Sequence, residues 1–207
     1  MNLMDVLQGQ LSGDMLNQIS NHIGAEPAQT ATAAQGVFAT LLGGLANNAS
    51  TESGLSSLGS ALDRDHDGSM LDDLMGMVGG VMQGSSSRAT DGEGIVGHIL
   101  GSNKEVAAEQ ISQKSGLNIG QVMKLLPILA PIVMNVLGKT KNSGGLDLGS
   151  LAGILMGSAQ QTQQQGGMGD LIGSVLGGVL GGNQQSSSQS SAGGGLASVL
   201  GGIFGGR

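Results

Sequence analysis

The sequence predicts an all-α protein in which two related helical hairpins flank a helix–loop–helix segment, with short glycine-rich helices in a low-complexity tail. Three observations lead to this prediction. Apolar residues recur at helical spacing, residues 3–46 align without a gap with residues 95–138, and glycines stand where the first helix of each copy must stop. Because Trp and Tyr are absent and Phe occurs twice, the core must consist of aliphatic side chains and Met.

The helices of the two copies are recognised by the residues at their ends. Gly24 and Gly116 occupy the position after a helix where positive φ is favoured. Asn118 and Gln121 have the spacing of a capping box, and Pro27 suits the first turn of a helix. We therefore expect helices near residues 14–23, 28–46, 104–115 and 119–137, and no sheet.

The second copy carries the ILGS motif, the segment AAEQISQKSGLNIGQV and the run LLPILAPIVMNVLG. In these motifs the chain resembles the YidB-like family of bacterial proteins of unknown function, over about residues 1–140. The resemblance implies a small all-helical domain. It implies no activity, and no functional residue can be transferred from it.

Four segments follow from these patterns. Residues 1–47 and 91–141 are the two hairpin copies, residues 48–90 hold an acidic loop and a Ser-rich linker, and residues 142–207 form a Gly/Gln/Ser-rich tail. The Gln- and Ser-rich stretches of the tail have the composition of disordered spacers.

Glycines recur every fourth residue in several apolar stretches, a pattern known as a glycine zipper. On a helix, the segment 171–180 places Leu, Ile and Val on one half of the circumference and Gly and Ser on the other. Its three interior glycines cost about 3 kcal/mol of helix propensity, so the helix must pack against another helix to be stable. The stripes are Gly169/Gly173/Gly177/Gly181, Gly149/Gly153/Gly157, Gly76/Gly80/Gly84 and Ala197/Gly201/Gly205.

The loop from Asp63 to Leu74 matches the first half of an EF-hand loop, D-x-D-x-D-G. Alternate residues of such a tight loop point inward, and the glycine at position six permits the turn. An EF-hand has a bidentate Glu at position twelve, where this chain has Leu74, so an aspartate from a displaced position would have to complete the site. The predicted calcium ligands are Asp63, Asp65, Asp67, the Ser69 carbonyl and Asp73. The alternative is an acidic turn that caps the next helix.

Two glycine motifs resemble nucleotide sites and fail on context. Residues 92–97 match G-x-G-x-x-G but follow a Ser-rich linker rather than a strand. The segment 138–140, GKT, lacks the first glycine of a phosphate-binding loop. The histidines His22, His66 and His98 have no zinc or triad spacing, and His66 falls on a non-ligand position of the acidic loop.

Charge and composition limit the partners. The formal charge of −7, with eight Lys and Arg, argues against nucleic acid. With no Cys there is no thiolate metal site. The amino terminus lacks the basic region of a signal peptide, so a cytoplasmic location is expected. The longest apolar run, residues 122–137, is shorter than the about 20 residues of a membrane span and contains Lys124 and two prolines. We expect it to be a core helix.

Together these patterns predict a non-catalytic protein that binds calcium and forms homo-oligomers through helix–helix contacts. The alternative is a peripheral membrane protein whose short apolar-faced helices lie in the lipid interface. Such helices usually carry Lys and Arg on the polar face, whereas these carry Gly and Ser. No convergent acid, base and nucleophile set can be named, so we expect neither an enzyme nor a small-molecule substrate.

Overall fold

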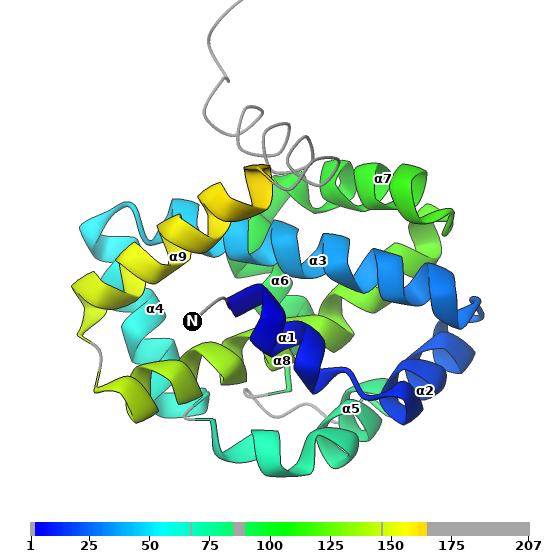
Figure 1. Cartoon of the computed structure of the whole chain (residues 1–207), viewed down its shortest axis with the longest axis horizontal. Helices are drawn as coiled ribbons and strands as arrows, with labels where there is room; N and C mark the ends of the chain where they lie inside the picture. Colours follow the sequence, from blue (N-terminus) through cyan, green and yellow to red (C-terminus); the bar gives the residue numbers. More distant parts are fainter. Residues whose placement is uncertain (1–2, 67, 85–89, 146, 165–207) are drawn as a thin grey trace, which may run out of the picture.

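The computed structural model describes residues 3–66, 68–84, 90–145 and 147–164. Across these residues the chain is helical and contains no strand, which confirms the predicted all-α class (Figure 1). Buried apolar side chains from the helices of both copies, from the segment between them and from the last described helix form one continuous core.

The first copy forms α1 (Leu3–Gln10), α2 (Gly13–Ile23) and α3 (Pro27–Asn48). The side chain of Ser12 accepts a hydrogen bond from the Met15 N–H and caps α2, which ends at Gly24 with φ of +69°. Pro27 opens α3, where its missing N–H costs nothing. The two predicted helices are present, and α1 is an addition that the sequence patterns did not indicate.

The second copy forms α6 (Gly92–Leu100), a 3₁₀ turn η2 (Gly101–Asn103), α7 (Lys104–Ser115) and α8 (Ile119–Gly144). The expected capping box is formed, because the side chains of Asn118 and Gln121 bond each other's backbone N–H groups. Gly116 ends α7 with φ of +77°. The helix α8 continues through two prolines, and most of its residues are buried.

The two copies pack against each other and do not form separate units. Helix α3 packs against α6, α7 and α8 of the second copy, while α1 and α2 also contact α8. Gln121 donates a hydrogen bond to the Gly24 carbonyl at 2.6 Å, and Gln29 donates one to the Gly116 carbonyl at 3.5 Å. These four residues are equivalent in the sequence repeat, so the contacts between the copies are reciprocal.

The segment between the copies forms α4 (Glu52–Asp65), a 3₁₀ turn η1 (Ser69–Asp73) and α5 (Leu74–Met82), all packed on α8. From its residues, the helix that follows the acidic loop could extend over residues 70–81. It begins instead at Leu74, because Asp73 accepts a hydrogen bond from the Gly76 N–H and acts as the N-cap.

The last described helix, α9 (Leu148–Gln164), lies in the predicted tail and packs against α3 and α4. Leu151 and Leu155 are fully buried in this contact. Among the described residues, a Cβ atom added at Gly153 or Gly157 would meet no atom within 4 Å, so no described helix covers these glycines. In Figure 1, α9 crosses in front of α3 and α6 lies behind it. The zipper stripes beyond residue 164 lie outside the described residues.

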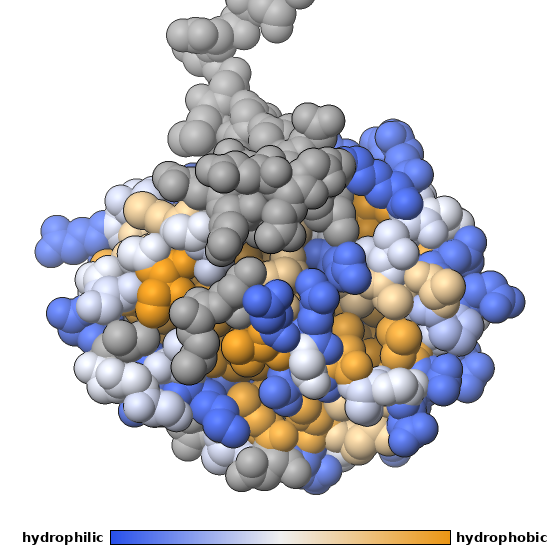
Figure 2. Space-filling view, viewed as in Figure 1, coloured by the Kyte–Doolittle hydropathy of each residue, from blue (hydrophilic) through white to orange (hydrophobic). Residues whose placement is uncertain are grey.

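The face that carries α1 exposes apolar surface at its centre and hydrophilic side chains around its edge (Figure 2). Among the described helices, α8 is long and apolar enough to cross a membrane by length and composition. In its most apolar stretch, 67% of the residues are buried inside the molecule, as expected for a core helix.

Candidate helix-binding groove and acidic loop

Helices α4 and α6 each pack on α8 and leave an open groove between them, with a volume of about 760 Å³. The end of α3 and Met134 of α8 form its floor. The lining side chains divide into an apolar floor and a polar rim. The apolar floor and lower walls consist of Leu45, Leu58, Ala61, Ile95, Ile99 and Met134.

The wall formed by α4 consists mainly of small residues. Gly54, Ser57 and Ala61 recur at spacings of three and four along this helix and line the groove. The opposite wall presents Gly94 and Ile95 of α6. A Cβ atom at Gly54 or Gly94 would meet Asn48 or Asp91, so close approach of a bound helix would depend on Ser57 and Ala61 of α4.

The polar groups at the rim are largely engaged with the backbone. Asp91 caps α6 by accepting a hydrogen bond from the Gly94 N–H. The Asn48 amide donates to the carbonyls of His98 and Ile99 at 3.1 and 3.4 Å and so joins α3 to α6 at the groove. Among the apolar lining residues, Ala61 and Ile95 are half-buried and can gain contact, while the other four are already buried.

The acidic loop adjoins one end of this groove, because Asp65 at the end of α4 lines it. Of the predicted ligands, Asp63 is exposed and accepts a hydrogen bond from Lys141 of α8. Asp73 caps α5, Ser69 begins η1, and Asp67 lies outside the described residues. Within the part of the chain that the structure describes, no three His, Asp or Glu side chains gather as a metal site.

Gly68 adopts the backbone conformation that the sixth position of such a loop requires, with φ of +88°. It also packs directly on α8. A Cβ atom at this position would lie 2.6 Å from the Lys139 Cβ and 2.8 Å from its Cα. The glycine is thus required both for the turn and for close contact with the core helix.

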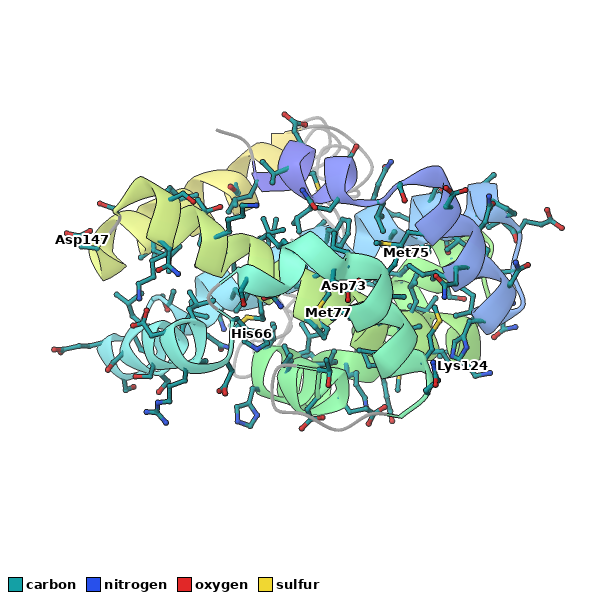
Figure 3. The ribbon with its side chains drawn as sticks, turned by 90° about the horizontal axis from the view of Figure 1, so that it is seen from below. His66, Asp73, Met75, Met77, Lys124 and Asp147 are labelled. Carbon is teal, nitrogen blue, oxygen red and sulfur yellow. The ribbon has the colours of Figure 1, made fainter. Side chains whose placement is uncertain are left out.

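His66 of this loop lies in the core, with 2% of its surface exposed. Figure 3 shows it on the underside of the molecule, with Met77 of α5 close by. Asn135 Nδ2 lies 3.3 Å from His66 Nδ1 and donates to the Pro131 carbonyl at 2.9 Å. Burial lowers the pKa of His66 below its usual value, and the charge of Asp65 partly opposes this effect.

Neither the groove nor the buried histidine was indicated by the sequence patterns. His22 and His98 are exposed helix residues, whereas His66 is buried with the Asn135 amide of α8 beside it. The polar Asn135 within the apolar run of α8 was the one available signal, since a fully buried amide needs a polar partner.

The described residues thus define an all-helical protein with a surface groove and an adjoining acidic loop. Residues 5–140 match the family model described as a bacterial protein of unknown function (DUF937), and the chain belongs to this family. The expectation of a bacterial family of unknown function is confirmed. The match spans both copies and the segment between them and ends before α9. No curated protein and no solved structure matches the chain.

Proposed function

We propose that this protein is a non-catalytic assembly protein whose copies associate through helix–helix contacts. The groove between α4 and α6 carries this proposal, since its apolar floor and small-residue wall suit an apolar helix. The exposed glycines of α9 add a second flat surface for close helix contact. Charged side chains are few, so little desolvation opposes such contacts.

The test is the size of the assembly in solution. Sedimentation velocity of the full chain, compared with a chain ending at Gln164, reports whether association occurs and whether the tail drives it. We expect the full chain to form concentration-dependent oligomers and the shorter chain to be smaller. A full chain that stays monomeric at high concentration contradicts the proposal, and flotation of that monomer with liposomes would instead support the membrane-surface alternative.

A second proposal is that the acidic loop binds calcium, in the ~10⁻⁴ to 10⁻³ M range of sites without a full ligand set. The observation that favours it is Gly68 at the sixth position with left-handed backbone, between a helix that ends at Asp65 and a turn that leads to α5. In this proposal calcium displaces Lys141 from the Asp63 carboxylate and stabilises the loop.

The competition with Lys141 gives calcium binding a specific prediction. Lys141→Met is expected to strengthen calcium binding by about 0.5–1 kcal/mol, or roughly two- to fivefold, because it frees the Asp63 carboxylate. Asp63→Ala is expected to weaken it. Lys124→Met is the matched control, since this exposed lysine lies elsewhere on α8, away from the loop (Figure 3). Calorimetric titrations that are identical for all variants would leave the loop as an acidic turn.

A further inference from the structure

We infer that the groove between α4 and α6 is filled by the tail segment Leu171–Leu180 of a second copy, bound as a helix. This inference rests on the proposed self-association and names the two surfaces that form it. Three observations carry it: a packing pattern that the chain already uses, the chemistry of the groove, and the place where α9 ends.

The tail segment repeats a pattern whose packing is visible within the described fold. On α3 the run Leu41–Leu45 reads Leu-Leu-Gly-Gly-Leu, and it packs against α6. A Cβ atom at Gly44 would lie 2.6 Å from the Ile99 Cγ2 and 3.1 Å from the Ile99 carbonyl oxygen. The glycine pair therefore lets one helix lie against the backbone of another. Residues 175–179 read Val-Leu-Gly-Gly-Val and can pack in the same way.

The chemistry of the segment matches that of the groove. Residues 171–180 carry no charge, so no charged side chain loses its hydration on binding. Their Leu, Ile and Val side chains match the half-buried Ala61 and Ile95, and their Gly and Ser residues match the small-residue wall at Ser57. Burial of the apolar half, at about 25 cal/mol per Å², offsets the propensity cost of the glycines.

The position of α9 favours a second copy over the chain's own tail. Helix α9 begins beside α4 and runs along the opposite side of α3 from α6, ending toward α7 (Figure 1). The seven residue steps from Gln164 to Leu171 can span at most about 25 Å when fully extended. To reach the groove, the chain's own tail would have to pass from the end of α9 to the side of α3 where α6 lies. A neighbouring chain has no such restriction.

Cysteine pairs test this assignment directly, because the natural chain has no Cys. Full-length chains carrying Ser57→Cys and Ser174→Cys are mixed under oxidising conditions, and disulfide-linked dimers are measured by non-reducing electrophoresis. We expect linked dimers from this mixture. Ser56→Cys is the matched control, since Ser56 is exposed on the same helix and does not line the groove. In parallel, Ser57→Trp is expected to weaken association at least about tenfold in sedimentation, while Ser56→Trp leaves it unchanged.

The outcomes separate this inference from the proposed function. If the full chain associates but neither Ser57 variant differs from its Ser56 control, the groove is not the contact and only the inference fails. If the double variant Ser57→Cys/Ser174→Cys cross-links within monomers and the mixture does not cross-link, the chain's own tail fills the groove and the second-copy assignment is wrong. A chain that never associates overturns the proposed function itself.

Discussion

At the scale of single residues, Gly68 separates two effects that usually occur together, backbone conformation and steric contact. Gly68→Ala introduces strain at positive φ and a clash with the backbone of Lys139. Gly24→Ala has the same strain but meets no atom within 4 Å. We expect Gly24→Ala to cost about 1–2 kcal/mol and Gly68→Ala about 1–3 kcal/mol more, measured by urea unfolding. If Gly24→Ala and Gly68→Ala destabilise the protein equally, Gly68 is not in close contact with α8.

His66 gives the stability of the protein a pH dependence. Well above pH 6.5 the histidine is neutral in both folded and unfolded chains, and it contributes no slope. As the pH falls below that value, the unfolded chain binds a proton that the buried His66 does not, because its pKa is lowered in the fold. The free energy of unfolding should therefore fall by up to about 1.4 kcal/mol per pH unit until the lowered pKa is reached.

The histidine variants identify the source of this slope. His66→Gln should remove it, while His22→Gln, on an exposed part of α2, should leave it in place. Urea unfolding between pH 7 and pH 5 provides the measurement. A slope that persists in the His66→Gln variant would assign the pH dependence to other groups.

At the scale of helices, α6 contains two glycines with opposite expected effects. A Cβ atom at Gly92 would overlap the carbonyl oxygen of Pro127, where the first turn of α6 lies against α8. That carbonyl has no amide four residues on to bond, because Pro131 lacks an N–H. Gly97 on the same helix meets no atom within 4 Å. We expect Gly92→Ala to destabilise by about 3 kcal/mol and Gly97→Ala to stabilise by about 1 kcal/mol in thermal unfolding.

The helices that were predictable from sequence are those with local start and stop signals. Gly24, Gly116 and the Asn118 capping box act within a few residues, so their effect is readable without the fold. The helix α6 was not predictable in this way, because its glycines at 92, 94 and 97 are typical of a loop and only Gly92 shows its packing on α8 once the fold is known. The groove and the burial of His66 likewise depend on contacts between distant segments.

At the scale of the whole molecule, α9 extends the packed domain beyond the residues that match the family model. Leu151→Ala is expected to cost about 2–5 kcal/mol, because Leu151 is fully buried where α9 packs. Met156→Ala on the same helix, where the side chain is 42% exposed, should change stability by no more than about 0.5 kcal/mol. Chemical unfolding of the two variants tests this. Equal, small effects would show that α9 is not part of the cooperative unit.

Domain swapping follows from the reciprocal contacts of Gln29 and Gln121. Each glutamine bonds the carbonyl of the glycine that ends a helix in the other copy, and α3 packs on all three helices of that copy. None of these contacts depends on the two copies belonging to the same chain. A variant whose connection between α3 and α6 is too short to fold back can therefore exchange its second copy with a neighbour. Each compact unit of that swapped dimer would keep the contacts between the two copies.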